Sequence, residues 1–377
     1  MNEEKNLNQE SFQSSLLSDS EKSKRKMRKI SKKTSLALIT GGILIFIFAL
    51  VGQTVFLPPD PNSNFEVNLS IEKGESLSEI AFNLKNKKLI KSEFVFKGLA
   101  LITQKGSKIK AGLYLLSPSM NMIKVLNKIS LGETIKKEVT IIEGWTLRDI
   151  GWHFENQGNF TAEELFEIAG FPAVNYEEAG DLPEPVDFSE KFEFLKEKPE
   201  NISLEGYLFP DTYQFYPNAS PRDIVEKMLS NFEIKISGEL KKKIASQGKT
   251  LFEILTMASI LEKEIKTKEE KKTAAGVLWK RIKSGWPLQV DATLTYLTGK
   301  DSSSLAAEDF EIDSLYNAYK YYGLPLGPIC NPGLESIEAA VYFVESPYWF
   351  YLTTGEGKAV FSRTLEEHNI NREKYLK

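Results

Sequence analysis

Two carboxylates lie on one mostly apolar segment of this chain, Glu262 and Glu264 in the run Ala258-Ser259-Ile260-Leu261-Glu262-Lys263-Glu264. A carboxyl group beside apolar surface keeps its proton to a higher pH than in water, which suits it to general acid–base catalysis. Other reactive side chains are scarce, because the 377-residue sequence holds 2 histidines and 1 cysteine. We therefore expect no Cys/His metal site, no cofactor and no Cys–His nucleophile.

The two glutamates lie on a segment with the periodicity of an amphipathic helix, which should start near Thr250 and continue past Ile265. Its apolar stripe comprises Leu251, Ile254, Leu255, Ala258, Leu261 and Ile265. At about 100° per residue, Glu262 and Glu264 project about 160° apart, so they cannot face the same cleft. The spacing does not choose between them, and it leaves open that both are ordinary surface acids.

Polar segments rich in glycine and proline follow this helix and a second helix predicted at 274–282. They are Pro287-Leu288-Gln289-Val290-Asp291, Tyr316-Asn317-Ala318-Tyr319, Gly323-Leu324-Pro325 and Asn331-Pro332-Gly333. Loops of this kind often carry binding residues. Upstream, residues 171–203 are rich in proline and acids and predict a surface insertion, whereas residues 204–217 concentrate aromatic side chains near Glu205. That aromatic cluster fits a hydrophobic core and a groove that stacks on sugar rings equally well.

A basic cluster precedes a long uncharged segment near the start of the chain. Residues 22–33 are rich in lysine and arginine, and residues 34–57 are apolar. A helix of that length crosses a hydrocarbon core about 30 Å thick, and the positive-inside rule keeps the basic cluster in the cytoplasm. We predict a disordered cytoplasmic tail at 1–33, a single transmembrane helix at 34–57 and an extracytoplasmic remainder. A cleavable signal peptide is the alternative, but the apolar run is long for one and lacks a clear cleavage site.

Two similar strand–helix–helix patterns follow the proline-rich linker at 58–65. In each, a strand and a glycine turn lead to a capped helix and then to a second capped helix. The expected helix caps are Ser76, Ser92, Thr146 and Thr161, with an acid three residues after the first of each pair. The first pattern resembles LysM-type glycan-binding domains in its Gly-x-Ser-Leu-x-x-Ile-Ala sequence at 74–81.

Composition fits a folded protein, with 41% hydrophobic and 27% charged residues. The net charge of -4 argues against a general nucleic-acid binder. We expect a small LysM-like subdomain at 66–135 and a larger mixed α+β catalytic domain at 136–377. The lone Cys330 cannot form a disulfide within the chain.

In their order along the chain, the segments around residues 204–213, 258–264, 287–291, 316–319, 323–325 and 331–333 closely resemble the MltG (YceG-like) family of endolytic murein transglycosylases. The end of the chain, Phe361-Ser362-Arg363-Thr364 with Glu367-His368-Asn369, fits the same family. One departure is Val290-Asp291-Ala292, where the family commonly has a small polar residue before the aspartate and a proline after it.

The resemblance implies that Glu264 is the catalytic acid, since the family's acid is the second glutamate of the Glu-x-Glu pair. It implies a membrane-anchored lyase of cell-wall biogenesis that cleaves the MurNAc–GlcNAc bond within nascent peptidoglycan strands, forms 1,6-anhydro-MurNAc ends and ends strand elongation. Penicillin-binding proteins or other wall-synthesis proteins are implied partners. Residues expected to orient sugars or hold Glu264 are Glu205, Glu262, Gln289, Asp291 and Asn317.

Two other functions are compatible with these residues. A non-catalytic peptidoglycan-binding scaffold would use the same LysM-like unit and anchor. A lysozyme-type hydrolase would need a second carboxylate about 5 to 9 Å from Glu264, and Glu205 and Asp291 are the candidates.

Overall fold

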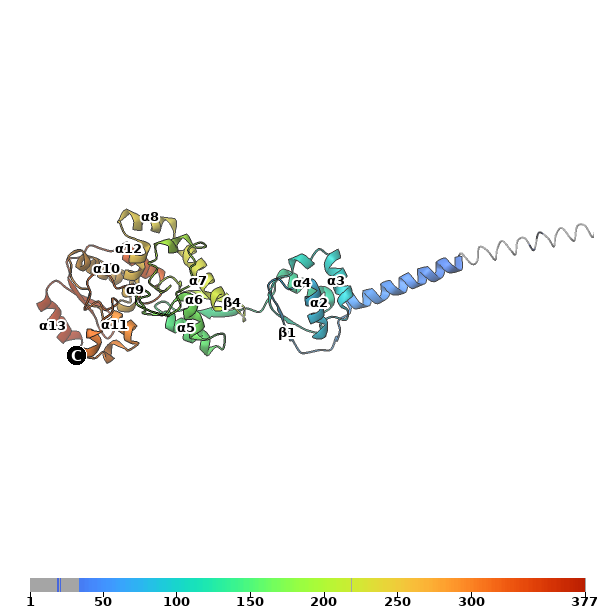
Figure 1. Ribbon diagram of the computed structural model, residues 1–377, viewed down its shortest axis with the longest axis horizontal. Helices are drawn as coiled ribbons and strands as arrows, with labels where there is room; N and C mark the ends of the chain where they lie inside the picture. The colour runs from blue at the N-terminus through green and yellow to red at the C-terminus, as the bar shows by residue number, and fades with distance from the viewer. Residues whose placement is uncertain (1–18, 20, 22–33, 218, 377) are drawn as a thin grey trace, which may run out of the picture. The chain divides into compact units, whose positions relative to one another are not determined.

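The computed structural model describes residues 19, 21, 34–217 and 219–376, and the chain divides into two compact units, residues 1–135 and 136–377 (Figure 1). Apart from Asp19 and Glu21, the expected cytoplasmic tail at 1–33 lies outside the described residues. The assignment of the units as LysM-like and catalytic stays a prediction.

The first unit contains a helix at Thr34–Phe56, which is 23 residues long. It is long and apolar enough to cross a membrane, and it is compatible with the expected anchor. Near its end, Val55 is buried in the hydrophobic core of the unit that follows. The end of this helix is therefore in contact with folded protein.

That core is enclosed by a two-stranded sheet and three helices. Strand β1 (Val67–Ile71) pairs antiparallel with β2 (Gly112–Leu116), so that Val67 lies opposite Leu116. Between the strands lie α2 (Leu77–Asn86), α3 (Glu93–Ile102) and a 3₁₀ turn at Gly106–Lys108, and α4 (Met122–Leu131) follows β2. The expected capping box at Ser76 and Glu79 is present, and Ser92 caps α3.

The second unit repeats this opening. Strand β3 (Lys137–Thr140) precedes α5 (Leu147–Asn156) and α6 (Ala162–Ala169), and capping boxes at Thr146 and Thr161 confirm both expected helix starts. Strand β3 pairs antiparallel with β4 (Thr212–Phe215), which is distant in sequence. A 3₁₀ helix at Glu193–Glu197 lies between them in the chain.

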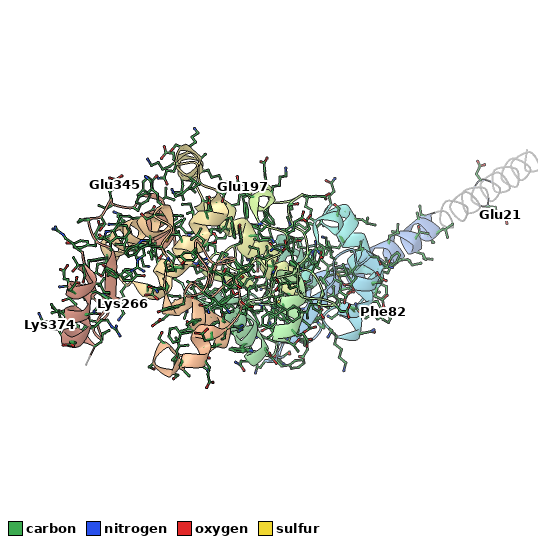
Figure 2. All side chains as sticks on the ribbon, turned by 60° about the vertical axis from the view of Figure 1, so that its left-hand side comes forward. Glu21, Phe82, Glu197, Lys266, Glu345 and Lys374 are labelled. Atoms are coloured by element: carbon green, nitrogen blue, oxygen red, sulfur yellow. The ribbon has the colours of Figure 1, made fainter. Side chains whose placement is uncertain are left out.

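A buried helix, α9 (Leu251–Glu264), organises the rest of the second unit. It is contacted by α8 (Gly238–Ser246), α10 (Lys268–Lys283), α11 (Asp291–Thr298) and α12 (Leu334–Val341). Thr250 caps it in a capping box, and its first N–H, on Leu251, donates to Glu197 (3.1 Å; Glu197 is labelled in Figure 2). Helix α7 (Pro221–Lys235) precedes α8, and 3₁₀ turns at Ser302–Ser304 and Ala307–Glu311 follow α11.

The chain closes with a hairpin and a helix. Strands β5 (Phe350–Thr353) and β6 (Ala359–Ser362) pair antiparallel, with Phe350 opposite Ser362, and α13 (Leu365–Tyr375) packs against them. The hydroxyl of Thr353 donates to the carbonyl oxygen of Glu264 (2.9 Å). The hairpin is thereby attached to the end of α9.

Three sequence expectations need correction. Helix α9 ends at Glu264 and does not continue past Ile265, which is already extended. Helix α10 begins at Lys268 and not at 274, where the second helix was expected to start, because Thr267 caps it. The segment at 171–203, expected to be a surface insertion, contributes to the core. Of the two alternatives for the aromatic segment at 204–217, the structure fits the core. The buried aromatic side chains are Phe188, Phe192, Phe194, Tyr207, Phe209, Tyr213 and Phe215.

Candidate active site

Glu264 is the last residue of α9, at the carboxyl end of the helix, where a negative charge is disfavoured. Burial, and next the charge of Asp291, raise the pKa of its carboxyl group to about 7, and a hydrogen bond from the Ala292 backbone opposes the shift. The side chain nevertheless keeps partial solvent exposure. A partly exposed carboxyl group that holds its proton near neutral pH can deliver that proton to a ligand.

Asp291 occupies the opposite kind of position, as the first residue of α11. The amino end of a helix favours a negative charge. The Tyr319 hydroxyl donates a hydrogen bond to the Asp291 carboxylate. Tyr319 is itself positioned by Asn317, whose side-chain oxygen accepts from the Tyr319 N–H (3.0 Å).

Two further side chains complete this region, and the sequence reasoning did not nominate either. Tyr351 lies on β5 two residues before Thr353, so both side chains face the end of α9. Burial, and next the charge of Glu264, raise the pKa of the Tyr351 phenol well above its usual value. Arg281 on α10 donates to the carbonyl oxygens of Trp349 (2.8 Å) and Leu288 (2.6 Å). Within the described residues this buried guanidinium forms no ion pair. A lone arginine on an otherwise apolar helix face is the signal that could have identified it.

Glu262 serves a different part of the molecule. Its carboxylate forms a buried ion pair with Lys271 of α10 (3.1 Å). It also accepts from the Gly333 N–H (3.0 Å) and the Ser336 hydroxyl (2.6 Å), at the amino end of α12. These contacts tie α9, α10 and α12 together, so the two glutamates have the divergent directions expected from helix geometry.

Glu205 is 1% exposed and lies in a network of donors. It accepts from the Leu147 N–H at the start of α5 (3.0 Å), the Tyr296 hydroxyl (3.2 Å) and the Asn331 side chain (2.9 Å). Burial raises the pKa of Glu205 to about 8, although the hydrogen bond from Leu147 opposes the shift. Every contact of this carboxyl group joins segments of the second unit to one another.

Asn317 and Gln289, the remaining two candidate residues, differ in their burial. Asn317 is fully buried, and its amide donates to the carbonyl oxygens of Phe310 (3.0 Å) and Ile312 (2.9 Å). Gln289 is exposed, has a positive φ of 52°, and its backbone N–H donates to Ala318 (3.0 Å). Its side chain therefore faces solvent close in sequence to Asp291, where it is free to meet a ligand.

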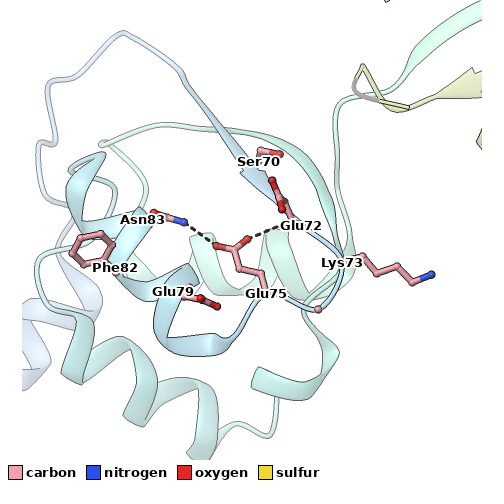
Figure 3. A pocket seen from close by; sticks show the side chains of 8 residues that line it. Ser70, Glu72, Lys73, Glu75, Glu79, Phe82 and Asn83 are labelled. Carbon is pink, nitrogen blue, oxygen red and sulfur yellow. Dashed lines mark hydrogen bonds between the residues drawn. The ribbon is translucent and has the colours of Figure 1, made fainter. Parts of the chain in front are cut away.

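The described residues contain no group of three or more His, Cys, Asp or Glu side chains arranged to hold a metal ion. A cavity of about 510 Å³ lies in the first unit, lined by Ser70, Glu72, Lys73, Gly74, Glu75, Glu79, Phe82 and Asn83 (Figure 3). Its central carboxylate, Glu75, already accepts from Asn83 (2.8 Å) and the Glu72 N–H (2.9 Å).

Comparison with known proteins places this geometry in context. The model of the YceG-like family matches residues 69–374. A protein of Bacillus subtilis (strain 168) named endolytic murein transglycosylase is 33% identical over 345 residues, which cover 90% of this chain and 91% of that protein. A protein of the same name from Streptococcus pneumoniae serotype 2 (strain D39 / NCTC 7466) is 32% identical over 330 residues; these are 84% of this chain but 59% of the longer relative. The crystal structure of a YceG-like protein from Listeria monocytogenes is 31% identical with a TM-score of 0.53, covering 81% of this chain and 99% of that one.

Proposed function

The chain belongs to the YceG-like family, and from this premise we propose that it is a membrane-anchored lytic transglycosylase that cleaves peptidoglycan strands internally. The relatives named endolytic murein transglycosylases support an enzyme of this type acting on murein. The observation that carries the assignment to particular residues is the pairing of a carboxyl group of raised pKa, Glu264, with a second carboxylate, Asp291, at the ends of two packed helices.

Glu264 acts first as the acid. It protonates the oxygen that leaves when the bond between MurNAc and GlcNAc breaks, and positive charge develops on the anomeric carbon of MurNAc. The C6 hydroxyl of the same sugar then attacks that carbon, and Glu264, now a carboxylate, takes the hydroxyl proton. The product is a 1,6-anhydro-MurNAc end, and no water is consumed. Because the attack is intramolecular, one acid–base residue suffices.

Asp291 supports this sequence in two ways. Its negative charge helps Glu264 to retain its proton before the bond breaks, and the same charge stabilises the positive anomeric carbon as the bond opens. The hydrogen bond from Tyr319 holds the Asp291 carboxylate in one orientation. Gln289, exposed beside this pair, is the nominated residue best placed to contact a sugar hydroxyl.

The pairing of Glu264 with Asp291 also favours a second candidate function. A lysozyme-type hydrolase also uses a raised-pKa glutamic acid and a neighbouring aspartate, and it transfers the glycan to water. Of the two carboxylates nominated for that role, Asp291 acts electrostatically on Glu264, whereas Glu205 is engaged by Leu147, Tyr296 and Asn331. Hydrolysis gives reducing ends and transglycosylation gives anhydro ends, which differ in mass by one water molecule.

The Thr34–Phe56 helix would retain the enzyme at the membrane, with both folded units on the extracytoplasmic side where nascent strands are made. Cleavage there would end strand elongation. Penicillin-binding proteins or other wall-synthesis proteins would share this location.

The proposal is tested by digesting purified peptidoglycan with the full-length protein and resolving the fragments by mass. We expect anhydro-muropeptides from the native protein. Replacement of Glu264 by Gln removes the transferable proton and should lower their release by about 10²-fold or more, while the circular dichroism spectrum stays unchanged. Reducing ends in place of anhydro ends would establish the hydrolase, and binding without cleavage would establish the scaffold.

A further inference from the structure

The outward side of α3 is unusually apolar for a solvent-facing helix. Phe94 is 83% exposed, Leu101 is 70% exposed and Ile102 is 84% exposed. Phe94 and Leu101 are seven residues apart, which places them nearly in line along the helix. The buried side chains of the same helix, Phe96 and Ala100, belong to the core of the first unit. The exposed residues therefore form a ridge that points away from that core.

We use the name α3 outer face for Phe94, Lys97, Leu101 and Ile102. Keeping large aromatic and aliphatic side chains exposed to water is unfavourable, because each of them lowers the free energy when it is buried away from water. Scattered exposed apolar residues are ordinary, but a contiguous ridge marks a contact surface.

Exposed lysines flank this ridge at both ends. Lys87, Lys88 and Lys91 are exposed just before α3, and Lys108 is exposed just after it. Among the residues that the structure describes, none of these four lysines forms an ion pair. Across residues 85–110 the one acid is Glu93, which pairs with Lys85 (3.3 Å). An apolar helix face flanked by lysines is the pattern of helices that lie in the interface of a membrane with anionic lipids.

The Thr34–Phe56 helix brings this unit to such an interface. Its 23 residues span about 34 Å, slightly more than the hydrocarbon core. Val55, at the end of that helix, is buried in the core of the unit that carries α3. Figure 1 shows α3 at the end of the unit that this helix joins. No long tether separates the bilayer from the α3 outer face.

We infer that the α3 outer face docks on the bilayer surface, with Phe94, Leu101 and Ile102 among the lipid chains and the neighbouring lysines at anionic headgroups. This inference rests on the proposed membrane anchorage of the enzyme. It gives the first unit a second contact with the membrane, beside the spanning helix. A single helix leaves a domain free to rotate about its attachment, and a second contact restricts that rotation.

The test uses the full-length protein in lipid nanodiscs, with one environment-sensitive fluorophore per sample and nitroxide-labelled lipids as quenchers. The label is placed at Gly98→Cys on α3, where a Cβ would have open space. Reference labels are Gly42→Cys in the Thr34–Phe56 helix and Asn68→Cys, exposed on β1. Native Cys330 is buried and is not expected to react.

In nanodiscs with phosphatidylglycerol, the label at position 98 should be quenched at least about twofold more strongly than the label at position 68. The double variant Phe94→Ser/Leu101→Ser should abolish this difference. The matched control Phe82→Ser, which removes a 54% exposed phenylalanine from α2, should preserve it. Quenching should weaken when phosphatidylcholine replaces phosphatidylglycerol.

Equal quenching at positions 98 and 68 would overturn the inference, as would a double variant that is still quenched or an equal effect in both lipids. The label at position 42 separates this failure from that of the anchor. If it is quenched while position 98 is not, the anchor stands and the docking is wrong; if it is not quenched, both fail. Release of anhydro-muropeptides by the same samples reports the catalytic proposal independently.

Discussion

Glu264 is the last residue of α9 and Asp291 is the first residue of α11, and these two helices pack against each other. The carboxyl end of one helix disfavours a negative charge, whereas the amino end of the other favours it. The charge of Asp291 adds to the burial that raises the pKa of Glu264 to about 7. The raised pKa of Glu264 therefore depends in part on the charge of a residue from another helix.

Replacing Asp291 by Asn should move the pH dependence of cleavage. The acid form of Glu264 is the active form, so activity falls as the pH rises through the pKa of about 7. Removing the neighbouring charge lowers that pKa, and the alkaline limb of kcat/KM should shift toward lower pH. Tyr319→Phe leaves the charge in place and serves as the matched control. An unshifted limb in Asp291→Asn would contradict the coupling.

Glu205 should make the protein less stable as the pH rises. Its pKa is raised from 4.5 to about 8, so the folded state holds a proton that the unfolded chain releases above pH 4.5. Its contribution to the unfolding free energy therefore falls between pH 4.5 and 8. Urea unfolding at pH 5 and pH 8 measures how much the free energy of unfolding falls between these pH values. Glu205→Gln should make that fall smaller than in the native protein by on the order of 3 kcal/mol. Equal losses in both proteins would show that Glu205 does not titrate in this range.

Lys271→Met should destabilise the second unit. In the native pair the Lys271 side chain is 4% exposed and the Glu262 side chain is 11% exposed. The change therefore leaves the Glu262 carboxylate largely buried without its cation. A buried charge without a partner costs about 3 kcal/mol. The double variant Glu262→Gln/Lys271→Met removes the orphaned charge and should recover part of that loss in urea unfolding. If Glu262 has only this structural role, the single variant should leave the pH profile of the remaining activity unchanged.

Gly276→Ala should disrupt the contact between α10 and the segment after α12. A Cβ at this position would lie 1.9 Å from the carbonyl oxygen of Val344, which is backbone and cannot move aside cheaply. We expect a loss of roughly 2–3 kcal/mol, typical of overpacking. Gly238→Ala, in the first turn of α8, meets no atom within 4 Å and should be nearly neutral. Equal thermal midpoints for the two variants would contradict the close approach.

Local features of the chain were predictable because their causes are local. The caps at Ser76 and Thr146 depend on residues three positions apart, and the apolar segment after residue 33 depends on composition alone. The divergence of Glu262 and Glu264 follows from the pitch of a helix. The helix boundaries between the two acids and α10 were harder to foresee. Helix α9 ends at Glu264, and Thr267 caps α10, a role that the charged residues around it concealed.

By itself the sequence determined which helix carries the two acids, that they point in different directions, and which family the ordered segments resemble. Only the tertiary structure decided what each acid meets: Asp291 for Glu264, Lys271 for Glu262, and Leu147, Tyr296 and Asn331 for Glu205. It also placed the aromatic segment after Leu204 in the core. The reason is physical, because a helical pattern sets the direction of a side chain, whereas its pKa and its partners depend on which distant segments pack against it.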